Sequence, residues 1–126
     1  MPYMQAAMLA VKADRKADYI TMSGMVWEIF RDLGALRVTE CWEDAVPEGD
    51  VTSMPMAVKR EPGEAVVLTL VEWPDKATYE AAMPRMGEDP RWADIGAAIG
   101  TEPFDGARMI WGGFEPVFEA HAGESA

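Results

Sequence analysis

Hydrophobic and polar residues follow one another along this chain in blocks that predict four strands and two main helices. Apolar runs typical of strands occupy residues 3–11, 36–43, 65–73 and 107–118. Helically spaced apolar residues separate the first run from the second and the third from the fourth. The resulting order, β, α, β, β, α, β, predicts an α+β, ferredoxin-like domain with one antiparallel sheet.

The distribution of charge predicts which strands lie in the middle of that sheet. Residues 3–11 carry no charge and residues 65–73 carry only Glu72, whereas the other two runs hold several charged side chains, as edge strands commonly do. We therefore predict the strand order 4-1-3-2. Both β-α-β crossovers are then right-handed, as nearly all such units are.

The first helix is predicted from Asp14, whose carboxylate would cap its start, to Gly34, which would take the left-handed conformation after its last turn. One apolar stripe would face the sheet: Tyr19, Met22, Val26, Ile29 and Leu33. The second helix is predicted to begin at the cap residue Asp75, and Pro84 is expected to kink or break it. A further short helix follows Asp89-Pro90 and ends at Gly100.

Both faces of the third strand are apolar, although the helices can cover only one face of the sheet. We therefore predict a homodimer that packs sheet against sheet, the arrangement of a dimeric α+β barrel. In the long connection 44–64, Ser53 and Pro55 predict one helical turn, with Lys59 and Arg60 facing water. This connection is either an arm at the dimer interface or a lid over a pocket.

Composition narrows the class of protein. The 126 residues, 49% of them hydrophobic, predict a single domain at 1–118 followed by a tail at 119–126. A net charge of −11 without a basic patch argues against nucleic acid as a partner, and no apolar run is long enough to span a membrane. Because Cys41 is the single cysteine, no internal disulfide forms, and we expect a cytoplasmic protein.

Glu40 is the first candidate for functional chemistry. Its strand parity matches that of apolar neighbours, so burial would cost several kcal/mol unless the carboxylate is paired or faces a cavity. Either it pairs with a basic side chain such as Arg108, or it is the acid or base of a pocket. Arg108 itself either clamps an anionic ligand or forms an edge-strand ion pair. Three tryptophans would line that pocket or pack in the core and the dimer interface: Trp42, Trp73 and Trp111.

Other common chemistries are not supported by the sequence. The single histidine, His121, lies in the tail, which argues against haem, and Cys41 has no base nearby, so a buried structural thiol is expected. Alternation sends Glu40 to one face of its strand and Cys41 and Glu43 to the other, so these three residues do not close on a metal ion. No cofactor and no metal site are predicted.

Four ordered blocks of the chain resemble the YbaA-like bacterial family of unknown function: ALRVTECWEDAVP (35–47), TSMPMAVK (52–59), VEWP (71–74) and PFDGARMIWGGFEP (103–116). The likeness spans nearly the whole chain and implies the dimeric α+β barrel fold, but no activity. Trp111 stands where the family pattern has a tyrosine, and Pro84 interrupts a helix that otherwise runs on.

Two functional classes therefore remain open at this point. The first is a small dimeric accessory protein, without turnover or with a small-molecule ligand. The second is a cofactor-independent, monooxygenase-like enzyme that acts on a small organic substrate in the barrel, because dimeric α+β barrels include both. The volume of the cavity separates them: a barrel filled by its own side chains excludes a substrate, whereas about 300 Å³ beside Glu40 or Arg108 admits one.

Overall fold

The computed structural model describes residues 2–123, which form a four-stranded antiparallel sheet. The strands are β1 (Tyr3–Lys12), β2 (Arg37–Trp42), β3 (Glu64–Trp73) and β4 (Ile110–Phe114). Their order, β2-β3-β1-β4, is the predicted 4-1-3-2, with the two runs predicted to be central in the middle. The α+β, ferredoxin-like prediction is therefore confirmed.

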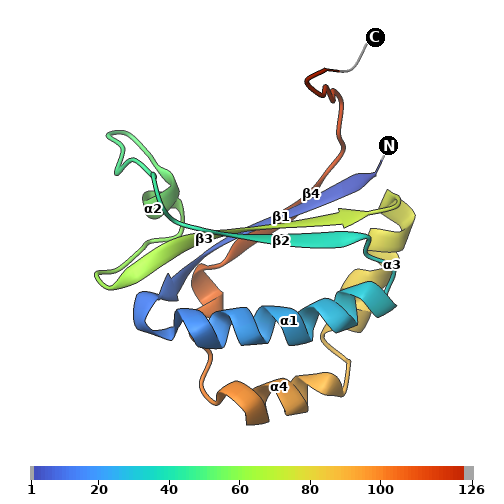
Figure 1. Cartoon of the computed structure of the whole chain (residues 1–126), viewed down its shortest axis with the longest axis horizontal. Coiled ribbons are helices and arrows are strands. Elements are labelled where there is room, and N and C mark those ends of the chain that lie inside the picture. Colours follow the sequence, from blue (N-terminus) through green and yellow to red (C-terminus); the bar gives the residue numbers. More distant parts are fainter. Residues whose placement is uncertain (1, 124–126) are drawn as a thin grey trace.

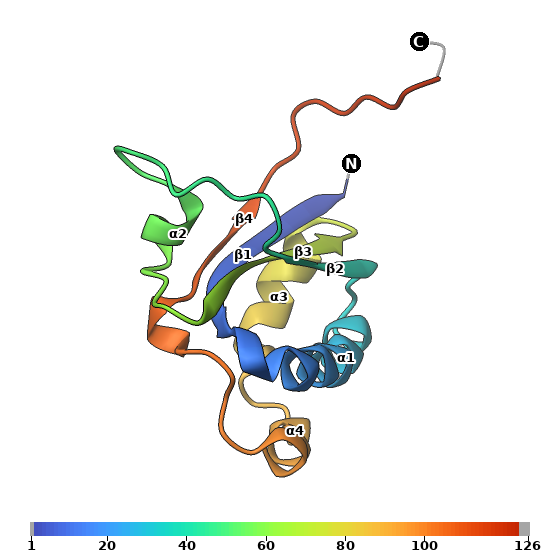
Figure 2. The same cartoon turned by 60° about the vertical axis from the view of Figure 1, so that its left-hand side comes forward.

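The main helices lie on one side of the sheet. These are α1 (Lys16–Asp32), α3 (Lys76–Met86) and α4 (Arg91–Ile99), whereas the single turn α2 (Met54–Ala57) lies on the other side (Figures 1 and 2). Two 3-10 turns, η1 (Ala13–Arg15) and η2 (Gly106–Arg108), complete the described elements. Within residues 2–123, no helix is long and apolar enough to cross a membrane.

The ends of the helices test the predicted caps. Gly34 has the predicted positive φ of 111°, and the amides of Gly34 and Ala35 each lie 3.0 Å from a carbonyl of the last turn of α1. Asp75 caps α3 as predicted, because its carboxylate accepts from the Thr78 amide at 2.7 Å. The cap at Asp14 is wrong: Asp14 lies inside η1, and α1 begins two residues later, at Lys16, without a side-chain cap.

Pro84 does not break its helix. The ribbon of α3 continues through Pro84 to Met86, where it ends. Because the proline lies in the last turn, only one hydrogen bond near the end of the helix is lost. The short helix α4 follows, and Gly100 ends it with a φ of 72°, as predicted.

The two faces of the sheet are covered very differently. The helix-covered face holds the main core, in which Trp73 is 0% exposed and lies against residues of α1 and α3. On the second face, here called the open face, Val58 packs on Ala10 and Val66 at one end. Further apolar side chains of that face and of α2 stay about half exposed: Met54, Met56, Ile110 and Phe114.

The 44–64 connection behaves only partly as expected. Ser53 caps the predicted turn α2, because its hydroxyl accepts from the Met56 amide at 3.1 Å. Arg60 does not face water as predicted. Its guanidinium forms ion pairs with Glu43 and Glu48, and its side chain is only 16% exposed. The connection is thereby tied to the end of β2.

The last strand is shorter than predicted. The sequence favoured residues 107–118, but β4 begins only at Ile110, because the Asp105 carboxylate accepts from the Ala107 amide and caps η2. After β4 the chain leaves the body of the domain on the side of the open face (Figures 1 and 2). Val117 and Phe118 in this tail are 86% and 83% exposed.

Candidate functional site

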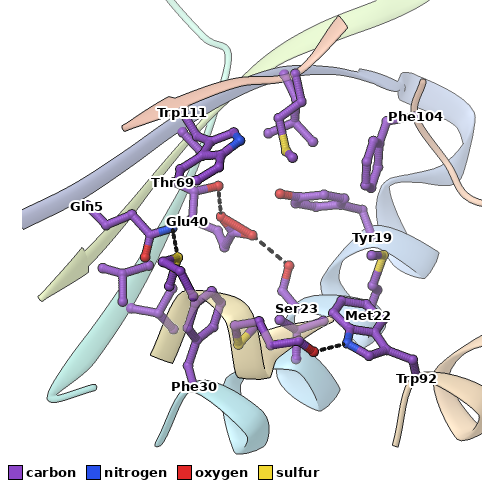
Figure 3. A pocket seen from close by; sticks show the side chains of 18 residues that line it. Gln5, Tyr19, Met22, Ser23, Phe30, Glu40, Thr69, Trp92, Phe104 and Trp111 are labelled. Atoms are coloured by element: carbon purple, nitrogen blue, oxygen red, sulfur yellow. Dashed lines mark hydrogen bonds between the residues drawn. The ribbon is translucent and has the colours of Figure 1, made fainter. Parts of the chain in front are cut away.

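A cavity of about 330 Å³ lies between the helix-covered face of the sheet and the helices. Figure 3 shows the 18 residues that line it. They come from all four strands, from α1, α3 and α4, and from the segment that leads into β4. Most are apolar, and five are aromatic: Tyr19, Phe30, Trp92, Phe104 and Trp111. The sequence thus builds a largely apolar chamber rather than a filled barrel.

The periodicities of strand and helix explain which side chains reach this cavity. Alternate residues of β1 point into it, and the small Ala7 lies at the middle of that strand, where the register pairs it with Thr69 and Trp111. From α1, the side chains of Tyr19, Ser23, Val26 and Phe30 face the same space, because residues three or four apart lie on one side of a helix. Because Ala7 is small, it leaves space at the centre of the sheet, and larger side chains border that space.

Glu40 projects into the cavity from β2 and is held by two hydroxyl groups. Ser23 of α1 donates to one carboxylate oxygen at 2.7 Å, and Thr69, the residue directly opposite Glu40 on β3, donates to the other (Figure 3). Both donors are neutral. The carboxylate is therefore fixed in place by hydrogen bonds without being neutralised by a cation.

The phenol of Tyr19 lies beside this carboxylate. Burial raises the pKa of Tyr19 far above its ordinary value, and the negative charge of Glu40 raises it further. Tyr19 is therefore a neutral hydroxyl throughout the physiological range. The cluster of Tyr19, Ser23, Glu40 and Thr69 consequently offers one acceptor charge surrounded by neutral hydroxyls.

Arg108 is not the partner of Glu40, and that predicted alternative is wrong. Its guanidinium binds both oxygens of Glu64, at 2.8 and 2.7 Å, and donates to the Lys59 carbonyl. The hydrogen bonds that Arg108 donates lower the pKa of the Glu64 carboxyl below its ordinary value. Arg108 occupies η2 rather than a strand, so it is directed to the start of β3 and is not among the residues that line the cavity.

The three candidate tryptophans have three different environments. Trp111 is 56% exposed and lines the cavity. Trp73 is fully buried in the core, where its indole N–H donates to the Gln5 side chain at 3.0 Å. Trp42 packs near Leu9 and Tyr19, with the Lys16 ammonium 5.0 Å from its ring centre. Of the candidate residues, the structure brings Glu40 and Trp111 together in one cavity.

Sequence reasoning missed several residues of this cavity. Ser23 and Thr69 were not singled out, although each is the polar position within an otherwise apolar face, and that interruption is a readable signal. Met83, Met86 and Met109 also line the space, and nothing in their spacing distinguishes them from core residues.

The expected buried thiol is also wrong, because Cys41 is exposed on the open face. The residue after Glu40 on an edge strand points away from the helices, and no described element of residues 2–123 buries it there. In residues 2–123, no three His, Cys, Asp or Glu side chains gather in a way that could hold a metal ion.

Comparison with known proteins identifies relatives over nearly the whole chain. The family model described as "Protein of unknown function (DUF1428)" matches residues 2–106. The uncharacterized protein YbaA of Escherichia coli K12 is 43% identical over 119 residues, which is 94% of this chain and 99% of that protein, and YbaA of Shigella flexneri matches equally.

The comparison with solved structures also finds proteins of the same fold. One is a monooxygenase from the gene ActVA-Orf6 of Streptomyces coelicolor in complex with the ligand nanaomycin D. It covers 95% of this chain and 91% of its own, with a TM-score of 0.55 and 17% sequence identity. At that identity the likeness concerns the fold.

Proposed function

We propose that this chain, which belongs to the DUF1428 family of proteins of unknown function, binds a small, largely apolar organic molecule in the cavity beside Glu40. The observation that carries the proposal is the cavity. Its volume of about 330 Å³ lies at the lower end of the range of small-molecule sites, and its lining combines apolar walls with a few converging polar groups. A packing role alone would call for a filled barrel.

The state of Glu40 supports the same proposal. A carboxylate placed among apolar side chains costs stability, and none of the ion pairs in residues 2–123 involves this one. Groups that persist at a cost to the fold are typical of functional sites. Trp111 beside it combines high exposure with a place in the lining, which suits the entrance of a ligand site.

We also propose that two copies assemble through their open faces, in the cytoplasm. Apolar side chains of that face are about half exposed, and the turn α2 and the segment that follows β4 lie on the side away from the helices (Figures 1 and 2). A second copy would cover them. The free thiol of Cys41 on the same face suits a reducing compartment.

Binding, rather than a particular reaction, is what the site supports. The solved neighbour is a monooxygenase that holds an organic ligand, but its 17% identity transfers no reaction to this chain. Glu40, held in place by Ser23 and Thr69, can orient a ligand whether or not a bond is later broken. We therefore propose binding of a ligand and no particular reaction.

A thermal-shift screen of a metabolite library tests the binding proposal. Compounds that raise the melting temperature of the wild-type protein are retested on Ala7→Leu, which fills the cavity floor, and on Ala81→Leu, which adds the same atoms to an exposed position of α3. We expect Ala7→Leu to abolish the shifts and to keep or raise the stability of the free protein, because filling a cavity commonly adds about 0.5–2 kcal/mol. Ala81→Leu should keep the shifts.

Two outcomes contradict the proposal. The first is a screen in which no compound raises the melting temperature of the wild-type protein. The second is a set of hits that bind equally well to both variants, since these compounds then occupy some other surface of the protein.

A further inference from the structure

The cavity lining contains a negatively charged side chain and no positively charged one. Among its 18 residues, Glu40 is the single charged side chain, and no lysine, arginine or histidine takes part. The Lys16 ammonium lies 5.0 Å from the ring centre of Trp42, and among the ion pairs of residues 2–123 none involves Glu40. A ligand that carries a carboxylate or phosphate would therefore meet one negative charge and no positive one.

The carboxylate of Glu40 still has capacity to accept. Ser23 and Thr69 each donate one hydroxyl hydrogen bond to it, and the Tyr19 hydroxyl lies beside it, whereas an ionised carboxylate offers about four acceptor positions. Even with all three hydroxyls counted, at least one position is left for a donor from a ligand. A donor that also carries positive charge gains most, because hydrogen bonds between ionised partners are about twice as strong as neutral ones.

The walls around Glu40 suit the same kind of ligand. Aromatic rings from α1, α4, β4 and the segment before it surround the cavity, and their faces attract cations. Four methionines add soft, adaptable surface for an apolar body. From the single charge, its free acceptor position and these walls, we infer that the ligand is an organic cation: an ammonium group on an aromatic or aliphatic body. This inference rests on the proposed function.

Calorimetric titration of the wild-type protein with three matched probes tests it. Naphthylmethylamine, naphthylmethanol and naphthoate share one ring system and differ in carrying a positive, a neutral and a negative polar group. We expect the amine to bind about tenfold or more tightly than the alcohol, and naphthoate to bind most weakly. Equal affinities for amine and alcohol, or tighter binding of naphthoate, overturn the inference and leave the binding proposal intact.

Two variants assign the preference to Glu40 rather than to the net charge of −11. Glu40→Gln should bring the affinity for the amine down to that for the alcohol, whereas Glu80→Gln, the same change on an exposed position of α3, should preserve the tenfold preference. Loss of the preference in Glu80→Gln contradicts the assignment. If Glu40→Gln does not fold, the wild-type comparison decides alone. If none of the probes and no library compound binds, the proposed function itself fails.

Discussion

The two faces of the sheet are built from alternate residues of the same strands, yet they differ in kind. The helix-covered face combines a sealed core around Trp73 with a cavity that holds Glu40. The open face is largely apolar, and of residues 2–123 Val58 packs on it at one end while Ile110 and Phe114 stay about half exposed. This difference is the basis of both proposals, a ligand on the helix-covered face and a second copy on the open face.

The largest effect is expected from a charge on the open face. Leu70→Asp places a carboxylate at the centre of the proposed dimer interface, where burial without a partner costs several kcal/mol. Light scattering should show the mass of a single chain. Ile20→Asp makes the same change on α1, where Ile20 is 60% exposed, and should leave the mass of the dimer unchanged. A wild-type protein that is a stable monomer at micromolar concentration removes the open face as an interface.

A second comparison concerns the two carboxylates Glu40 and Glu64. Glu64→Gln breaks the two-fold charged contact with Arg108, so the unfolding free energy should fall, and it should fall by more than in Glu40→Gln. Glu40→Gln should leave stability unchanged or raise it, because Gln still accepts from a hydroxyl and carries no charge into the cavity. Chemical denaturation of both variants measures the two values, and a large loss for Glu40→Gln would show that this residue has a structural role.

Several local features of this fold could be predicted from the sequence, whereas contacts between distant segments could not. Strand order, the caps at Asp75 and Ser53 and the parity of Glu40 were readable, because each depends on local periodicity or on a side chain and its nearby backbone. The partners of Glu40 were not, because Ser23 and Thr69 reach it only through the packing of α1 on the paired strands. Arg108 was misplaced for a local reason, because a turn capped by Asp105 replaces the start of the strand predicted at 107.

The paired glycines of β4 give a matched test of the two faces. A Cβ on Gly113, on the helix-covered face, would lie 2.5–2.9 Å from the ring and hydroxyl of Tyr3, whereas one on Gly112, on the open face, would make an ordinary 3.7 Å contact with Phe114. Gly113→Ala should therefore cost about 2 kcal/mol of unfolding free energy, in the range for overpacking. Gly112→Ala should cost less than about 0.5 kcal/mol. Equal effects in denaturant would contradict the packing seen at Tyr3.

The smallest effect is the dependence of stability on acid. Hydrogen bonds from Arg91 lower the pKa of Asp89 from 3.8 to about 2, and those from Arg108 lower the pKa of Glu64 below 4.5. Carboxyls with a depressed pKa stabilise the fold above their unfolded value and lose that contribution as the pH falls through the folded value. Unfolding free energy should therefore fall as the pH is lowered from about 4.5 towards 2, and Asp89→Asn should flatten that slope.

The methyl signals of methionine test the division between the two faces most directly. Four methionines line the cavity: Met22, Met83, Met86 and Met109. Four others belong to the open face or to α2: Met4, Met8, Met54 and Met56. In one NMR experiment on methyl-labelled protein, ligand titration should shift the first set, and a soluble paramagnetic agent should fail to broaden the signals of Met4 and Met8 in the second set. Ligand shifts confined to the open-face set, together with broadening of Met4 and Met8, would contradict the account.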